Sequence, residues 1–299
     1  MRDWYRRFRE KILSQVRFNV LSLNKTFEWM ESGKSIVRFG DGELSIILGG
    51  RGPGFQSYSK ELSKDLRTVF FSDNKNLLKC LPVTINAYSV DLVDHNEGTV
   101  NWWRKWLRDH FWRMLYLHSK ANREYGDTNV TRQYMRMLGC NSSAEQLAAY
   151  FSRVRNLFTG RDLIVVEGRK TRFGMGNDLF SNAKSVRRVL VPEVDAYSKK
   201  DEILNFLTST MGGSSTYVLA CGPLAKILAL CLAAGGEVVW DLGHLDIEYE
   251  WYLRSAQDKI PIPGKYVNES SVHYVDPVDT DPTLHQKYRT QIIFEVPVE

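Results

Sequence analysis

Short runs of apolar, mostly β-branched residues recur along the chain, and stretches with apolar positions at helical spacing lie between them. The runs that we predict as strands are 35–39, 81–85, 162–167, 187–191, 216–220 and 237–241. The stretches that we predict as helices are 3–31, 59–72, 100–119, 142–158, 177–184, 199–210 and 223–234. This alternation predicts an α/β fold with a mainly parallel sheet and helices on both faces.

Length and composition narrow the class of protein. The 299 residues predict a basic amphipathic helix over 1–30 and a single α/β domain over 31–299. Hydrophobic residues make up 43% and charged residues 25%, which argues against disorder. No apolar run reaches the roughly 18 residues that span a bilayer, and the N-terminus lacks the pattern of a secretory signal. Four widely spaced cysteines indicate reduced thiols, and we expect a cytoplasmic protein.

The positive charge is concentrated at the N-terminus. The chain has a net charge of +5, and residues 1–17 hold six basic and two acidic residues, so the remainder carries only +1. This distribution argues against a nucleic-acid partner. The apolar stripe from Trp4 to Val16 could contact the inner face of an anionic membrane or dock on the domain. The tryptophans of 101–115 could stack on sugars or fill the core.

Polar, glycine-containing segments follow four of the predicted strands. These segments are 38–43, 167–178, 221–223 and 241–250. Ligands of parallel sheets bind at the carboxyl ends of the strands, so we expect the four segments to converge on one cleft.

The first segment, RFGDGE, can hold a divalent cation. Gly40 and Gly42 allow a tight turn, and in an extended stretch the carboxylates of Asp41 and Glu43 point the same way. Paired carboxylates suit Mg²⁺ or Mn²⁺, which would also hold diphosphate oxygens. The alternative is a solvated turn in which Asp41 caps the next helix.

Two further segments can bind an anion or simply connect elements. In VEGRKTRFGMGND, at 166–178, Asn177 or Asp178 can cap a helix, and its free amides plus Arg169 can bind a phosphate. The segment has neither a Walker nor a GxGxxG pattern, and its alternative is a flexible surface loop. In ACGPLAK, Gly222 permits a sharp turn where a nucleotide could pack, but such turns more often only join a strand to a helix.

The last segment, DLGHLDIEYEWY, is the densest polar cluster. If it is helical, His244 and Glu248 share a face; if it is extended, Asp246, Glu248 and Glu250 do. One of these groups could act as general base on an acceptor hydroxyl. The alternative is an exposed acidic helix start, although the neighbouring aromatic residues indicate partial burial.

Taken in order, these segments resemble the GT-D-type bacterial glycosyltransferases, a family first catalogued as a domain of unknown function. The resemblance covers about 35–268, and several motifs in order are far more specific than any one of them. The matching pieces are SIVRFGDGE at 35–43, FQ at 55–56, TRQY at 131–134, VEGRKTRFGMGNDLFSNAKSVRRVL at 166–190, ACGPLAKILA at 220–229, DLGHLDIEYEWYL at 241–253 and KYVNE at 265–269.

The resemblance implies a Rossmann-like enzyme that uses a nucleotide-diphosphate sugar, with UDP-glucose as the expected donor. The family's metal-associated DxE motif falls on Asp41-Gly42-Glu43, which implies Mn²⁺ or Mg²⁺ as cofactor. Gln133 stands where we expect a proline, a departure that alters a loop but removes no charge. The implied acceptor is a growing glycan on a surface protein or polysaccharide.

The expected roles follow from this chemistry. Asp41 and Glu43 hold the metal, Glu248 accepts the proton of the acceptor hydroxyl, and His244 or Asp246 orients Glu248 or the sugar. The residues expected to bind the donor are Arg38, Gly40, Arg169, Gly176, Asn177, Asp178 and Gly222.

Two other classes of function are compatible with parts of the chain. A nicotinamide-dependent oxidoreductase would share the fold class, but GxGxxG is missing after the first predicted strand. A module that binds membrane or nucleic acid through its basic, aromatic helices would show salt-dependent binding without turnover of a sugar donor.

Overall fold

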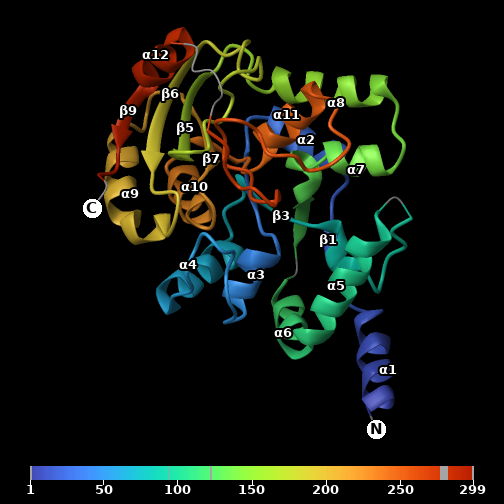
Figure 1. The fold of residues 1–299 in the computed structure, drawn as a ribbon. Helices are drawn as coiled ribbons and strands as arrows, with labels where there is room; N and C mark the ends of the chain where they lie inside the picture. Colours follow the sequence, from blue (N-terminus) through green and yellow to red (C-terminus); the bar gives the residue numbers. More distant parts are fainter. Residues whose placement is uncertain (1, 94, 122, 277–281, 298–299) are drawn as a thin grey trace.

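The computed structural model describes residues 2–93, 95–121, 123–276 and 282–297. Within them, nine strands form one sheet in the order β1-β4-β3-β2-β8-β7-β5-β6-β9, and every pair of neighbours is parallel (Figure 1). The strands are β1 Asn19–Val20, β2 Ser35–Arg38, β3 Leu77–Leu81, β4 Glu124–Asp127, β5 Asp162–Gly168, β6 Ser185–Val191, β7 Thr216–Ala220, β8 Val238–Asp241 and β9 Ile292–Glu295. The predicted α/β class with a parallel sheet is confirmed.

Helices cover both faces of the sheet. They are α1 Arg2–Leu13, α2 Leu23–Glu31, α3 Asp41–Ile47, α4 Lys60–Phe71, α5 Glu97–Asp109, α6 Phe111–Lys120, α7 Tyr134–Gly139, α8 Ala144–Asn156, α9 Lys200–Ser209, α10 Leu224–Ala234, α11 Leu245–Leu253 and α12 Pro282–Gln291. Ser22, Ser59 and Ser143 begin three of them, and each accepts a hydrogen bond from the amide three residues ahead. None of these helices is long and apolar enough to cross a membrane.

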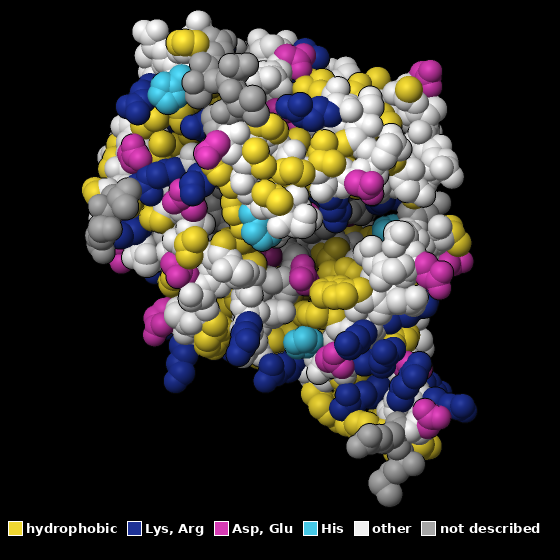
Figure 2. Space-filling model, in the orientation of Figure 1, with side chains coloured by type: hydrophobic (Ala, Val, Ile, Leu, Met, Phe, Trp, Pro, Cys, Tyr) yellow, Lys and Arg dark blue, Asp and Glu magenta, His cyan; other side chains and the backbone are white. Residues whose placement is uncertain are grey.

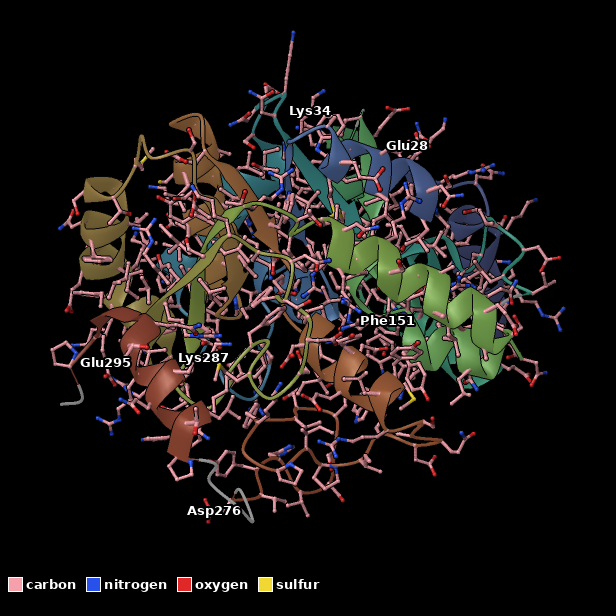
Figure 3. The ribbon with its side chains drawn as sticks, turned by 90° about the horizontal axis from the view of Figure 1, so that it is seen from above. Glu28, Lys34, Phe151, Asp276, Lys287 and Glu295 are labelled. Atoms are coloured by element: carbon pink, nitrogen blue, oxygen red, sulfur yellow. The ribbon has the colours of Figure 1, made fainter. Side chains whose placement is uncertain are left out.

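Alternate residues of each central strand enter two separate cores. In β5, Ile164 and Val166 pack in the layer of α4, α9 and α10, whereas Leu163 and Val165 pack in the layer of α2, α8 and α11. Figure 3 shows Phe151 of α8 beside α11, where its ring centroid lies 4.5 Å from that of Tyr252. Apolar burial on both faces therefore makes the sheet a rigid base for the loops that leave it.

The strand order brings distant loops together. From β2 the chain moves outward through β3 to β4, while β5 to β8 build the other half, so that β2 and β8 meet with Ile36 opposite Trp240. The carboxyl ends of β2, β8, β7 and β5 consequently lie side by side at one edge. The four loops that follow these strands are the polar segments singled out in the sequence.

Several predicted elements are wrong in extent. The predicted strand at 81–85 is wrong, because it shares only Leu81 with β3; Pro82 has no amide to donate, and a short 3₁₀ turn follows it. The predicted helix at 3–31 breaks into α1, β1 and α2, and the predicted helix at 177–184 is a series of turns. The short or polar strands β1, β4 and β9 were not predicted, since their sequences have no apolar run of typical strand length.

The N-terminal helix docks only in part. Ile12 and Val16 pack against the large core, and Leu13 is buried in it, while Trp4 and Phe8 remain exposed. The apolar stripe is therefore divided between a buried end and a free end.

Candidate functional site

A cleft of about 1060 Å³ opens at the carboxyl ends of the central strands (Figure 2). All four predicted loops contribute to its walls, among them Asp41 after β2, Thr171 after β5, Gly222 after β7 and His244 after β8. Further walls come from α5, from the segment before α7 and from the chain around Glu269. The predicted convergence of the four loops on one cleft is confirmed.

A buried lysine links three of these loops. Lys226, in the first turn of α10, is 3% exposed, and its Nζ lies 2.8 Å from Glu43 Oε1 and 3.0 Å from Asp241 Oδ2. The backbone amide of Arg38 donates to Asp241 Oδ2 at 3.0 Å, and the Arg38 guanidinium lies 3.8 Å from Oδ1. Burial opposes the charge of Lys226, but the Asp241 and Glu43 carboxylates raise its pKa above the ordinary value. Lys226 is therefore a fixed ammonium inside the cleft.

The two predicted metal ligands differ in their surroundings. Glu43 Oε2 accepts the Gly40 amide at 3.0 Å as part of a helix-capping contact, and Oε1 is paired with Lys226. Asp41, the first residue of α3, is exposed to the cleft, and limited hydration together with Glu43 raises its pKa. Asp41 can thus offer a carboxylate to a cation, whereas both oxygens of Glu43 already have partners. Among the described residues, no three acidic, histidine or cysteine side chains form a metal-binding group.

Glu248 lines the same cleft from the first turn of α11. Its side chain is nearly buried, and Oε2 accepts a hydrogen bond from the Met135 amide at 3.2 Å. Burial raises the pKa of Glu248 to about 7, although the Met135 amide and Arg132 oppose the rise. A carboxylate with such a pKa can accept a proton near neutral pH.

An ionic chain lies beside Glu248 in the cleft wall. Arg132 lies 2.6 Å from Glu269 Oε1, and His244 Nε2 lies 2.8 Å from Glu269 Oε2. Despite burial, Arg132 and His244 hold the pKa of Glu269 well below its usual range. Burial in turn lowers the pKa of His244, which Glu269 only partly offsets. His244 is thereby fixed in orientation by a carboxylate that stays ionised.

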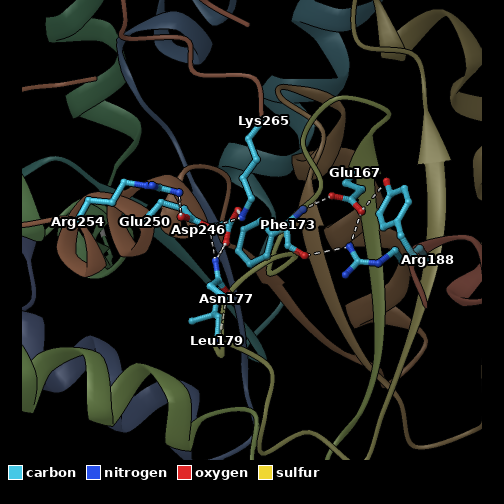
Figure 4. A network of polar contacts seen from close by, with 10 residues as sticks. Glu167, Phe173, Asn177, Leu179, Arg188, Asp246, Glu250, Arg254 and Lys265 are labelled. Atoms are coloured by element: carbon cyan, nitrogen blue, oxygen red, sulfur yellow. Dashed lines mark hydrogen bonds and ion pairs between the residues drawn. The ribbon is translucent and has the colours of Figure 1, made fainter. Parts of the chain in front are cut away.

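Asp246, the third residue expected to take part in the chemistry, belongs to a different cluster (Figure 4). Lys265 Nζ lies 2.6 Å from Asp246 and 2.8 Å from Glu250, and the Asn177 amide donates to the same two carboxylates at 2.8 and 2.7 Å. Neither Asp246 nor Asn177 lines the cleft. This buried cluster, defined by Asp246, Glu250, Asn177 and Lys265, joins the loop after β5 to α11 and to the chain near Glu269.

The other predicted donor residues of that loop also point elsewhere. Arg169 pairs with Glu295 at 2.8 Å and bonds the Val296 carbonyl, and Asp178 pairs with Arg155 at 2.9 Å. Gly176 lies near α12 rather than in the cleft. The residues of the loop that do line the cleft are Gly168, Lys170 and Thr171.

Arg38, Gly40 and Gly222 lie in the cleft wall as predicted. Gly222 has a φ of 61°, and a Cβ there would collide with the ring of Phe55. Gly243, with a φ of 45°, likewise leaves room for the Arg38 guanidinium. These glycines let the backbone and Arg38 approach the floor of the cleft.

Sequence reasoning missed Lys226, Arg132 and Glu269 as members of the site. Each lies inside a motif that carried the family resemblance, namely ACGPLAK, TRQY and KYVNE. The motifs therefore pointed to these residues. Sequence alone could not assign their roles, because a single charged residue in a turn or loop has no spacing pattern that identifies the residue it pairs with.

The fold and the cleft define a parallel α/β protein with a charged site where such folds bind nucleotides. A model described as the glycosyltransferase GT-D fold matches residues 36–270. The chain therefore belongs to the GT-D family of glycosyltransferases.

Relatives and solved structures agree with this family. The chain is 34% identical to a probable glycosyl transferase, Gly, of Streptococcus gordonii and 30% identical to glycosyltransferase GlyD of Streptococcus pneumoniae, with 93% of this chain covered in both. It spans 39% and 32% of the length of those proteins. A structure of domain of unknown function 1792 matches with a TM-score of 0.82 and 28% identity, over 98% of this chain and all of the other. A structure described as a new glycosyltransferase from Streptococcus sanguinis matches with a TM-score of 0.79 and 29% identity, over 94% of this chain and all of the other.

The buried cluster around Asp246 predicts a stability effect. Lys265→Met would leave the buried Asp246 carboxylate without a cation and Glu250 with only the half-exposed Arg254, so we expect the free energy of unfolding to fall by about 3–5 kcal/mol. Urea denaturation measures the change, and Lys287→Met, at an exposed position of α12, is the matched control. Equal stability of the two variants would contradict a structural role for the cluster.

Proposed function

We propose that this chain transfers a sugar, with glucose from UDP-glucose as the first candidate, to a hydroxyl group of a glycan acceptor. The observation that best supports this is the placement of Asp41, Lys226 and Glu248 along one cleft. A site for the diphosphate and a group that accepts a proton are the two parts that transfer to a hydroxyl requires. The cleft offers a candidate for each, and the candidates come from segments that follow neighbouring strands.

The diphosphate fits best near the start of α10, because the start of α3 is already capped by Glu43. Helix α10 begins at the cleft, where its dipole favours an anion, and Gly222 and Lys226 line the wall there. The cleft wall holds seven Lys or Arg residues and six Asp or Glu residues, so its charge nearly balances before a donor enters. A bound diphosphate would make the net charge of the cleft negative, which supports a requirement for a further cation.

A divalent cation, Mn²⁺ or Mg²⁺, would be held by Asp41 and would neutralise charge on the departing diphosphate. Glu43 does not fit as a second ligand while it pairs with Lys226 and caps α3. Its role in the proposal is to hold the Lys226 ammonium in place. In this proposal the chain supplies the fixed ammonium of Lys226, and the exposed carboxylate of Asp41 holds the added cation.

Glu248 accepts the proton of the acceptor hydroxyl in this proposal. Its pKa of about 7 lets it be ionised at neutral pH and still bind a proton during transfer. Arg132, Glu269 and His244 are positioning residues, because their ion pairs fix the wall that faces Glu248. The acceptor is proposed to be a surface glycoprotein or polysaccharide intermediate, modified on the cytoplasmic side of a membrane.

Donor and metal use can be tested together. Release of UDP would be measured across several nucleotide sugars, with and without Mn²⁺, in the presence of candidate acceptors. Metal-dependent release from one donor supports the proposal, and the absence of release from every nucleotide sugar would contradict it.

Glu248→Gln is expected to lower kcat by about 10²–10⁴-fold, because the amide keeps the shape but cannot accept the proton. UDP binding, measured by calorimetry, is expected to stay near that of the wild type. Glu202→Gln on α9 is the control for a neutralised acid far from the cleft. Turnover by Glu248→Gln close to that of the wild type would remove Glu248 from the chemistry.

The rate should also depend on pH through Glu248. The base works only when deprotonated, so kcat is expected to rise with pH and level off above about 7. Arg132→Met removes a cation that lowers the pKa of Glu248, so the midpoint should move to higher pH, and Arg132→Lys should restore it in part. A pH profile of kcat that is the same in the wild type and both variants would contradict this assignment.

The two acids of the DxE motif should behave differently. Asp41→Asn is expected to weaken Mn²⁺-dependent UDP binding by about tenfold or more, because it removes the available anionic ligand. Glu43→Gln is expected to lower stability while leaving the Mn²⁺ dependence of binding in place. Calorimetry with and without Mn²⁺ separates the two, and an equal loss of metal dependence in both variants would assign Glu43 to the metal as well.

A further inference from the structure

Helices α1, α5 and α6 form a lobe that projects from the molecule away from the sheet (Figure 1). Glu10 on α1 lies 3.1 Å from Arg108 on α5, and the Arg9 guanidinium on α1 lies over the Phe111 ring on α6, 5.4 Å from its centroid. The Arg9 guanidinium also donates to the Arg108 carbonyl at 3.0 Å. These contacts fix the three helices as one unit, which we call the N-terminal lobe.

Large aromatic side chains are exposed on this lobe. Among the described residues, the exposed tryptophans are Trp4, Trp102 and Trp112, with 69%, 46% and 62% of their surface accessible, and all three lie here. The ring of Phe8 stacks on Trp4 at 5.7 Å, and Tyr116, one turn after Trp112, is 60% exposed. Exposed aromatic pairs on two adjoining helices are unusual on a surface that contacts only water.

The same lobe holds the positive charge of the chain. Its three helices contain ten Lys or Arg and four Asp or Glu residues, a net charge of +6, whereas the whole chain carries +5. The rest of the chain therefore carries −1. Figure 2 shows Lys and Arg side chains gathered over α1 and α5 with apolar side chains beside them.

We propose that the N-terminal lobe binds the surface of an anionic lipid bilayer. Tryptophan and tyrosine rings with a polar edge settle at the level of lipid headgroups, and Lys and Arg beside them attract anionic headgroups. The lobe supplies both, and its charge is complementary to such a surface while the rest of the molecule is not. The proposal goes beyond the transfer reaction, because no residue of the proposed chemistry lies on the exposed face of the lobe.

The composition favours lipid over a protein partner. Protein interfaces exclude lysine from their centres and bury aromatic residues in pockets. Here Lys11, Lys105 and Lys120 are exposed on the same three helices as the exposed aromatic residues, and these helices project from the molecule. The three helices of the lobe are amphipathic rather than apolar all round, which suits contact with the surface of a bilayer.

The test uses the full chain and sedimentation with vesicles of phosphatidylcholine, either pure or mixed in equal amounts with phosphatidylglycerol. Binding is expected only to the mixed vesicles and should weaken as salt rises. The triple variant Arg7→Glu, Lys105→Glu, Arg113→Glu is expected to bind them on the order of 100-fold less. Its control is Lys64→Glu, Lys75→Glu, Lys287→Glu, which changes the net charge equally at exposed positions elsewhere.

The aromatic contribution is tested by Trp4→Ser combined with Trp112→Ser, with Tyr58→Ser at another exposed site as control. Binding should fall in the double variant alone, while thermal stability and UDP release with a soluble acceptor stay unchanged. Equal binding to both kinds of vesicle, no binding, or full binding by the lobe variants would overturn the proposal. If the chain does not bind vesicles but self-associates or binds DNA through the lobe, the proposal is also overturned. The absence of UDP release from the wild type and every variant would contradict the proposed function and would leave the vesicle-binding result to decide the present proposal.

Discussion

The structure of the site depends on one buried ammonium. A lysine that is almost fully shielded from water is stable only with carboxylates against it, and Lys226 has Glu43 and Asp241 at 2.8 and 3.0 Å. These partners stand at the ends of different strands, so the charge requirement fixes the loops after β2, β7 and β8 relative to one another. Asp241 also accepts the Arg38 amide, so the same carboxylate ties the end of β2 to this ion pair.

A second group of charges acts on the neighbouring wall. Lys265 neutralises Asp246 and Glu250 behind the cleft, while Arg132 and Glu269 form part of its surface. The carboxylates of the acidic helix α11 thus have two roles. Its buried face holds loops in place, and Glu248 alone among its carboxylates lines the cleft with a pKa raised to about 7.

The sequence allowed much of this to be predicted. The run of apolar strands and helices was sufficient for the parallel sheet, and polar residues after strands were sufficient for the convergence of Asp41, Gly222 and Glu248. The pairing of charges was not predictable, because Lys226 and Lys265 pair with carboxylates on other segments of the chain, and no local sequence spacing indicates those partners. The turns at 177–184 were mistaken for a helix because Asn177 has the pattern of a helix cap. Its Oδ1 does accept a bond from the Leu179 amide, but its Nδ2 is held by Asp246 and Glu250, and no helix follows.

The pairing of β2 with β8 has a consequence for how the molecule forms. Arg38 and Asp241, which bond to each other at the floor of the cleft, lie 203 positions apart in the chain. Contacts of such long sequence separation are entropically costly to close and form slowly. The centre of the sheet therefore cannot close before β8 is available, and a chain growing on the ribosome has no complete cleft until β8 has emerged.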